Sequence, residues 1–488
     1  MIGTLARDWF VIVPDFPRRA CSVLAILLAS IASTLGAQQS ATDPGTAPFI
    51  AIPAGLVAVT HVQLIDGSGS PAKPDHTVVL RGDRIEAVGP SADIAVPAGA
   101  RVLDLRGHSV LPGLVGLHEH TYFGGVGGFT DMRVSAPLLY LALGVTTAMT
   151  AGSRSPAFEL ELKRRVDRGD IPGPRFHVSG PYLDIAAGGP VNRVAVTTPA
   201  EARRVVAEWA ERGATWFKFL GGASRAVMGA AVEEAHGRGL KVTGHLCSVT
   251  FTEAAALGMD ALQHGFITNS DYVRGKRPDE CPPGNMQVQA DVDLASGPVR
   301  ESIRKIVAAG SAVVSTLGVY ETFDPERARL DPGAMAMLAP ATRREVEENH
   351  ARVAARGFTV PTRLLKKMME WERMFVAAGG LLGAGSDPWG TGYLPGFGNL
   401  RNYQLLVEAG FTAEQAVQIM TLNGARILGV DRELGSIAPG KLADLVVVQG
   451  DPLRAPEAIH RVVTIFKGGA GYDSGHLRAA ARGKVGVE

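Results

Sequence analysis

Hydrophobic and polar positions alternate in short segments near both ends of the chain. In residues 56–111, segments such as Val57–Val62 are separated by Gly- and Asp-containing turns, which is typical of β-strands. Residues 431–475 have the same pattern, with Leu445–Val448 and Val462–Phe466 as predicted strands. We therefore expect the two ends to form one small β-sandwich domain that encloses a central domain.

The pattern changes in residues 112–430, where apolar segments alternate with amphipathic helices such as Pro199–Arg212 and Arg225–Arg238. This alternation predicts parallel βαβ units. The predicted strands are Leu114–Leu117, Val145–Met149, Arg175–Val178, Trp216–Phe219, Lys241–His245, Ala261–His264, Ala312–Ser315 and Leu381–Ala384. A (β/α)8 TIM barrel requires eight such strands, so we expect an α/β fold of that class. Residues 325–378 exceed one crossover and predict additional helix, as a lid or as a contact in a homo-oligomer.

Composition fits a large globular enzyme better than a nucleic-acid-binding protein. The chain has 488 residues, of which 46% are hydrophobic, so a substantial core can form. Its 49 Lys and Arg residues nearly balance 48 Asp and Glu residues, giving a net charge of +1. Because no basic stretch goes beyond short pairs, we expect a small-molecule substrate and no nucleic-acid partner.

The N-terminus has the layout of a secretory signal. Arg18 and Arg19 precede an apolar segment, Cys21–Leu35, which small residues separate from a polar start at Gln38. We expect a signal peptide over residues 1–37 and export to the periplasm or the medium. The apolar segment is shorter than the roughly 20 residues of a membrane-spanning helix, so no stable membrane span is expected in the mature protein. A retained membrane anchor is the alternative. Residues 38–55 form a linker and residues 476–488 a tail.

The chain has three cysteines, Cys21, Cys247 and Cys281, and they do not indicate a fold held together by disulfides. Cys21 would leave with the signal peptide, and Cys247 and Cys281 are too few for a disulfide framework. These two residues could pair with each other, but the sequence does not decide this.

Side chains that bind metals gather at the carboxyl ends of the predicted strands. They are His118, His120, Lys218, His245, His264 and Asp387. Each one alone has an ordinary structural explanation, such as a core histidine or a lysine that reaches solvent. In a TIM barrel, however, these strand ends meet on the face where catalytic groups belong. His118 and His120 are two residues apart in an extended segment, so both imidazoles can face one metal ion.

As a set, these residues resemble the two-metal members of the amidohydrolase superfamily. The resemblance covers roughly residues 56–466, and its segments are Leu111–His120, Lys218, Gly244–His245, Gln263–Gly265, Gly385–Asp387 and Gly435–Val446. It is greatest for the imidazolonepropionase-like and Xaa-Pro dipeptidase-like branch, which includes ochratoxinase-like amidases. The sequence of the segment Phe219–Ala223 differs from that expected of a typical dipeptidase, so the resemblance does not determine the substrate.

The resemblance implies a metal arrangement and a mechanism. His118, His120 and Asp387 would hold one divalent ion, expected to be zinc, and His245 and His264 would hold a second. Lys218, converted to N6-carboxylysine, would bridge the two ions. A buried lysine favours its neutral amine, which is the form that reacts with carbon dioxide. The ions would activate a bridging hydroxide, and Asp387 would act as the catalytic proton carrier.

Three further residues are candidates for substrate binding from their position alone. His177 ends the third predicted strand, and Tyr393 and Arg401 follow Asp387. The expected reaction is hydrolysis of amide or peptide bonds in dipeptides, N-acyl amino acids or ochratoxin-like amides.

Two alternatives make different predictions. A one-metal deaminase or imidazolone-type cyclic-amide hydrolase of the same superfamily would lack the strand-four lysine, whereas this chain has Lys218. A non-enzymatic barrel relative would usually lose metal ligands, whereas all six positions are filled here.

Overall fold

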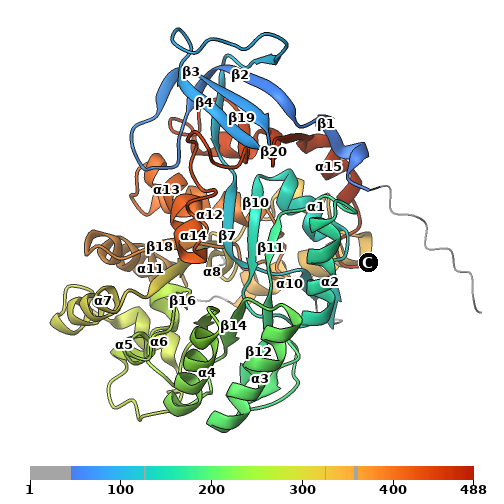
Figure 1. The fold of residues 1–488 in the computed structure, drawn as a ribbon. Helices are drawn as coiled ribbons and strands as arrows, with labels where there is room; N and C mark the ends of the chain where they lie inside the picture. The colour runs from blue at the N-terminus through green and yellow to red at the C-terminus, as the bar shows by residue number, and fades with distance from the viewer. Residues whose placement is uncertain (1–44, 126–127, 325, 357–360) are drawn as a thin grey trace, which may run out of the picture. The chain divides into compact units, whose positions relative to one another are not determined.

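The computed structural model describes residues 45–488 apart from 126–127, 325 and 357–360 (Figure 1). The predicted signal peptide at residues 1–37 therefore lies outside the described residues, together with residues 38–44 of the predicted linker. Within the described part of the chain, no helix is both long enough and apolar enough to cross a membrane.

Strands from both ends of the chain form one nine-stranded sheet, drawn in blue and red in Figure 1. Its strands are β1 (Ile50–Ile52), β2 (Gly55–Leu64), β3 (Lys73–Gly82), β4 (Arg84–Pro90), β5 (Arg101–Asp104), β6 (His108–Pro112), β19 (Leu445–Gln449), β20 (Val462–Lys467) and β21 (Ala470–Asp473). β19 runs antiparallel to β6, with Leu445 opposite Pro112, and β1 pairs with β21. Strands from the two ends of the chain therefore pair in one sheet.

This sheet branches at β2. β2 pairs with β3 along one edge, and along its other edge it pairs in succession with β5 and β6, both parallel to it. A cluster of buried apolar side chains, including Val59, Val78 and Phe466, lies against these strands. The predicted arrangement of two packed sheets in a β-sandwich stays a prediction.

The central region contains parallel strands at all eight predicted positions. They are β7 (Leu114–Glu119), β10 (Val145–Thr150), β11 (Arg175–His177), β14 (Trp216–Phe219), β15 (Lys241–Gly244), β16 (Ala261–Gln263), β17 (Ala312–Ser315) and β18 (Leu382–Ala384). β7, β10 and β11 form one sheet, and the later five lie in order in another. β18 also approaches β7, because the amide of Asp387 donates to the carbonyl of His118 at 2.7 Å.

The third strand differs from its predicted bounds. β11 ends at His177, but only Val178 separates it from β12 (Ser179–Asp184), which pairs with β14 so that Tyr182 lies opposite Lys218. The parallel segment therefore continues to Asp184, and a short strand, β13 (Val194–Ala195), pairs with its end. The sequence analysis placed His177 at the end of the third strand, whereas the parallel segment continues beyond it to Asp184.

Most helices lie between successive parallel strands, and the last four follow β18. They are α1 (Ser135–Ala142), α2 (Pro156–Asp167), α3 (Pro199–Arg212), α4 (Arg225–Gly237), α5 (Phe251–Ala256), α6 (Asn285–Asp291), α7 (Gly297–Ala309), α8 (Leu317–Glu321), α9 (Pro332–Met335), α10 (Pro340–Arg356), α11 (Pro361–Ala377), α12 (Phe397–Glu408), α13 (Ala413–Met420), α14 (Leu422–Leu428) and α15 (Ser474–Ala481). α3 begins at a capping box in which Thr198 accepts from the amide of Glu201, and it ends at Gly213, whose φ of 106° suits glycine. The additional helix predicted in residues 325–378 is present as α9–α11, whereas its role as a lid or an oligomer contact stays a prediction.

Candidate metal centre

The six side chains predicted to bind metal lie together at one end of the parallel strands. His118 is in β7 and Lys218 in β14, whereas His120, His245, His264 and Asp387 follow β7, β15, β16 and β18. Because the carboxyl ends of parallel strands converge, residues far apart in the sequence meet there. We call this set of six residues the candidate metal centre.

Asp387 lies in the middle of the candidate metal centre. Its Oδ1 is 3.1 Å from Nε2 of His120 and 3.5 Å from Nε2 of His118, and its Oδ2 is 3.7 Å from Nδ1 of His264. His118, His264 and Asp387 offer ligand atoms that all lie within 4.8 Å of one another. The ring of His245 is 4.6 Å from that of His264, centroid to centroid. This spacing is compact enough for metal binding.

Backbone strain is concentrated at two of these residues. His264 and Asp387 both have positive φ angles, of 67° and 47°, a region that residues other than glycine rarely adopt. The amide of His264 donates to Val314 at 3.0 Å, and that of Asp387 donates to His118. Gly385 allows the close approach, because a Cβ there would collide with the backbone of His118. The strands thus hold both side chains in an otherwise unfavourable conformation.

Burial keeps the histidines in the form that binds metal. It lowers the pKa of His245 to about 4 and lowers the pKa of His118, His120 and His264 below the usual value. Burial would raise the pKa of Asp387, but the neighbouring histidines outweigh it and hold this pKa well below the usual value. The centre therefore presents neutral imidazoles and an ionised carboxylate near neutral pH, as metal ligation requires.

Lys218 is buried at the floor of the centre. Its Nζ lies 2.9 Å from Nε2 of His118 and 5.4 Å from the centroid of the Tyr182 ring. Burial lowers the pKa of Lys218 to about 8. Its strand neighbours, Phe217 and Phe219, are also buried and carry no charge. A substantial fraction of neutral amine therefore exists near neutral pH.

Two polar side chains orient histidines of the centre, and the sequence did not single them out for this role. Oε1 of Gln263 lies 2.7 Å from Nδ1 of His118, so Nδ1 donates and the lone pair of Nε2 faces Lys218 and Asp387. Oγ1 of Thr316 lies 2.8 Å from Nδ1 of His264. Such second partners fix the orientation of a ligating imidazole.

Glu119, between the two histidines of β7, faces the opposite side of the strand. Its carboxylate accepts hydrogen bonds from the Ser386 hydroxyl and, at 2.7 Å, from Nδ2 of Asn399. Burial raises the pKa of Glu119 to about 7, although these donors oppose the shift. The contact joins β7 to the residue before Asp387 and so positions the catalytic candidate.

Aromatic side chains lie beside the centre. The strands β8 (Tyr122–Gly125) and β9 (Gly128–Asp131) form a hairpin that the sequence did not predict. The ring of Tyr122 stacks on His120 at 4.8 Å, and its hydroxyl lies 2.8 Å from that of Tyr182. The ring of Phe129 contacts those of Tyr122 and Trp389, each at 5.4 Å. Gly124 and Gly128, flanked by aromatic residues, were the signal that could have indicated a hairpin.

The three residues predicted to bind substrate do not join the six ligands. His177 has Lys163, Asp167 and Lys241 as its charged neighbours, and burial lowers its pKa to about 4. His177 lies near the start of the segment that continues to Asp184, whereas Tyr182, further along it, lies opposite Lys218, and the predicted role of His177 in substrate binding stays a prediction. The hydroxyl of Tyr393 donates to the carbonyl of Gly398 at 2.7 Å.

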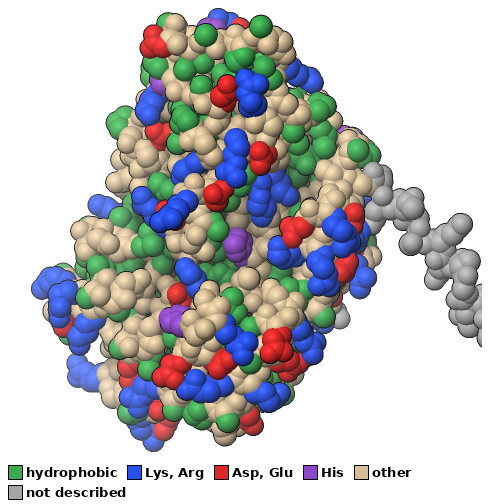
Figure 2. All heavy atoms as spheres, viewed as in Figure 1, with side chains coloured by type: hydrophobic (Ala, Val, Ile, Leu, Met, Phe, Trp, Pro, Cys, Tyr) green, Lys and Arg blue, Asp and Glu red, His purple; other side chains and the backbone are tan. Residues whose placement is uncertain are grey.

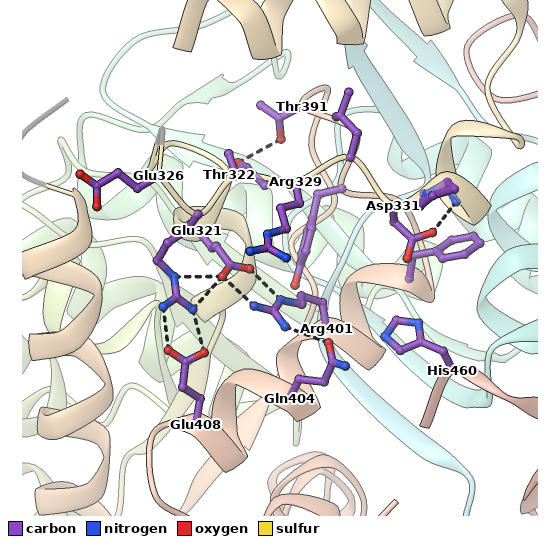
Figure 3. A pocket seen from close by; sticks show the side chains of 18 residues that line it. Glu321, Thr322, Glu326, Arg329, Asp331, Thr391, Arg401, Gln404, Glu408 and His460 are labelled. Carbon is purple, nitrogen blue, oxygen red and sulfur yellow. Dashed lines mark hydrogen bonds and ion pairs between the residues drawn. The ribbon is translucent and has the colours of Figure 1, made fainter. Parts of the chain in front are cut away.

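Arg401 is likewise engaged elsewhere. Its guanidinium donates to Glu321 at 2.8 Å (Figure 3). Arg401 and Tyr393 line a cavity whose described lining contains none of the six ligands, and we call it the second cavity to separate it from the candidate metal centre. A direct role for Tyr393 or Arg401 in substrate binding stays untested.

Cys247 and Cys281 form a disulfide bond, with their Cα atoms 4.9 Å apart. The sequence left this pairing open. Cys247 follows His245 by two residues, so the bond ties the loop that contains Cys281 to the rim of the candidate metal centre. On the face of the molecule in Figure 2, acidic and basic side chains are intermixed, as the near-zero net charge implies.

Comparisons with known proteins relate the chain to amidohydrolases. Residues 373–470 match the amidohydrolase family. A 5-methylthioadenosine/S-adenosylhomocysteine deaminase from Symbiobacterium thermophilum is 25% identical over 77% of this chain and 80% of its own length.

Two solved structures resemble the described fold. A Xaa-Pro dipeptidase with bound methionine in its active site has a TM-score of 0.64 at 20% identity, over 86% of this chain and 100% of its own. Ochratoxinase from A. niger has a TM-score of 0.63 at 18% identity, over 86% and 95%. At such identities the likeness concerns the fold, and it implies a TIM-barrel-type fold of mixed α/β content.

Proposed function

We propose that this chain cleaves the amide bond of small substrates such as dipeptides, N-acyl amino acids or ochratoxin-like amides. Its amidohydrolase superfamily domain and its similarity to hydrolases that act on carbon–nitrogen bonds support this proposal. The observation that carries the proposal is the candidate metal centre. Four neutral imidazoles and an ionised carboxylate are packed there around a buried lysine whose pKa is lowered to about 8. Neutral imidazole nitrogens and a carboxylate are the ligands that divalent cations such as zinc take, and the ligand atoms of His118, His264 and Asp387 lie within 4.8 Å of one another.

The residues fit two divalent ions, for which we propose zinc. His118, His120 and Asp387 would hold one ion, His245 and His264 the other, and Lys218, carboxylated on Nζ, would bridge them. His118 and Lys218 support this arrangement, because their nitrogens already face each other at 2.9 Å. Ions held there would supply Lewis acidity, which activates water and polarises the scissile carbonyl.

Asp387 is the residue proposed to move the proton. Its carboxylate is ionised, and its side chain retains 14% of its exposure, so an incoming water can reach it. Asp387 would take the proton of the attacking water and deliver it to the amine nitrogen as the C–N bond breaks. The products are a carboxylic acid and an amine. Gln263 and Glu119 would act by holding His118 and the segment of Asp387 in place.

The aromatic surface supports a substrate with an apolar group beside the cleaved bond. Tyr122, Phe129 and Trp389 form a continuous row of ring contacts that begins at His120. Apolar and aromatic walls with few polar groups are typical of small-molecule sites.

The proposal also includes the fold: a closed (β/α)8 barrel beside a β-sandwich. The approach of β18 to β7 supports the closure of the barrel.

A one-metal deaminase is the second candidate function, since one relative carries a deaminase name. The two candidates differ in metal content and substrate. The proposal expects two metal ions per chain by atomic emission, and hydrolysis of apolar dipeptides or N-acyl amino acids that Asp387→Asn abolishes. One metal ion per chain, with activity confined to adenine nucleosides or cyclic ureas, would instead establish the second candidate.

We also propose that the protein is exported. The basic pair Arg18-Arg19 before an apolar segment supports this, and so does the disulfide between Cys247 and Cys281, because disulfides persist in oxidising compartments.

A further inference from the structure

The second cavity, of about 530 Å³, lies between α8, residues 326–334, α12 and the 3-10 helix η4 (Pro456–His460) (Figure 3). The described residues that line it include none of the six side chains of the candidate metal centre. Its size is within the range of small-molecule pockets. The cavity is therefore a separate place where a ligand of amino-acid size could bind.

The carboxylates at the centre of this cavity are already paired. Glu321 accepts hydrogen bonds from Arg327 and Arg401, each at 2.8 Å, and Glu408 accepts two from Arg327 at 2.7 Å. Figure 3 shows Glu321 directed toward Arg401. Because these charges compensate one another, neither carboxylate is available to bind a cationic ligand.

Donors, in contrast, are left over. Arg329 forms no hydrogen bond or ion pair within the described part of the chain, and Figure 3 shows its guanidinium directed toward Glu321 and Arg401. Gln404 uses its Oε1 to accept from Arg401 at 2.9 Å, so its amide NH₂ group remains available. Glu326, an exposed carboxylate of the lining, points away from these groups in Figure 3. The arginine end of the cavity therefore favours an anion.

The rest of the lining contains five polar side chains, Thr322, Asp331, Thr391, Tyr393 and His460, beside a group of apolar ones. Leu330, Pro332, Ala334 and Phe397 belong to it. Asp331 caps α9 by accepting from the amide of Ala334 at 2.9 Å. This carboxylate disfavours a second anionic group at its end of the cavity. The lining thus matches a molecule with one anionic head and an apolar body.

We propose that the second cavity binds organic carboxylates with an apolar body, and that Arg329 pairs with the carboxylate while the amide group of Gln404 donates to it. Guanidinium and carboxylate groups match in geometry, and their hydrogen bonds are charge-assisted. The proposal depends on the side chains of this cavity and stands independently of the proposed function.

The test uses the full chain and the probe 3-phenylpropionate, with its neutral amide 3-phenylpropanamide for comparison, in isothermal titration calorimetry. Wild-type protein is expected to bind the acid and to bind the amide at least about fivefold more weakly, as the loss of charge-assisted hydrogen bonds implies. L-Phenylalanine forms a further arm, which shows whether an ammonium group near Asp331 is tolerated.

Variants assign the binding to the second cavity. Arg329→Ala is expected to weaken binding of the acid at least about fivefold, whereas Arg344→Ala, an exposed arginine of α10 outside the cavity, leaves it unchanged. Gln404→Glu, from a different element, is expected to weaken it too, because the new carboxylate repels the probe. Equal affinity for acid and amide, unchanged binding in Arg329→Ala and Gln404→Glu, or no binding to wild-type protein would each overturn the proposal. Probe held at the candidate metal centre would persist in both variants.

Discussion

Lys218 is the residue on which the proposed two-metal arrangement depends most directly. It is buried, and the described neighbours that surround it offer it an imidazole and an aromatic ring, with no hydrogen bond to a carboxylate. A lysine kept for structure alone would keep its charge in solvent or pair it. A lysine that becomes a carbamate would instead need its own amine in the neutral form, carbon dioxide to react with it, a base to take the released proton and cations to balance the new charge.

Lys218→Met tests this role, because Met keeps the bulk of the side chain and removes the amine. We expect the variant to fold, to bind fewer metal ions and to lose at least about 100-fold in activity, since a bridging ligand is lost. Metal content by atomic emission and initial rates on an apolar dipeptide measure both effects. Lys305→Met, on the exposed face of α7, is the control. Two metal ions per chain and near-normal turnover in Lys218→Met would show that the bridging assignment is wrong.

The six residues of the candidate metal centre could be predicted because they follow apolar segments whose ends must converge. Their partners could not. Gln263 reaches His118 only through the pairing of strands that are distant in the sequence. Tyr182 was missed because the third strand was expected to stop at Val178, whereas the chain continues as β12 after a single irregular residue. Pairing and strand breaks depend on tertiary packing, to which local patterns are insensitive.

At the scale of elements, α11 packs against the parallel strands through a buried acid. Glu372 of α11 accepts from the hydroxyl of Ser315, in β17, at 3.0 Å, and its other oxygen, Oε1, has no hydrogen-bond partner among the described residues. Burial raises its pKa from 4.5 to about 8. The folded protein therefore holds a proton there that the unfolded chain releases above about pH 4.5.

This linkage predicts a pH-dependent stability. Because the folded-state pKa is raised, the contribution of protonated Glu372 is fully present below pH 4.5 and is lost as the pH rises to about 8. Glu372→Gln keeps the shape without the ionisation, so it should match wild type near about pH 5 and be more stable by roughly 2–4 kcal/mol near about pH 9. Denaturant unfolding at both pH values measures the difference. Glu370→Gln, exposed on the same helix, is the control, and an equal effect at both pH values would contradict the prediction.

At the scale of the whole molecule, the disulfide between Cys247 and Cys281 is consistent with the proposed export. The disulfide joins residues 34 apart in the sequence and ties a loop to the rim of the candidate metal centre. Closing such a loop restricts the unfolded chain and typically stabilises a protein by about 2–4 kcal/mol. A reducing compartment would remove that contribution. Export would therefore supply the conditions in which this pairing persists.

Export makes a direct prediction about the N-terminus. If residues 1–37 are a signal peptide, the mature protein should begin near Gln38, because small residues precede it at the expected cleavage position. N-terminal sequencing of protein recovered from the periplasm or the medium would check this. Mass spectrometry of the same sample under non-reducing conditions should show Cys247 and Cys281 linked. Full-length protein recovered from the cytosol alone would contradict the signal-peptide interpretation.

The pairing of β6 with β19 imposes a delay between the synthesis of β6 and its pairing with the partner strand. Ser109, in β6, bonds to the carbonyl of Gly450, 341 residues later in the chain. At a synthesis rate of about 5–20 residues per second, the early strands wait roughly 20–70 s for their partners to leave the ribosome. Throughout that interval the unpaired edge and the apolar side chains of β6 are open to other nascent chains. We therefore expect the nascent chain either to have the exposed surface of β6 covered by a chaperone or to be exported before it folds.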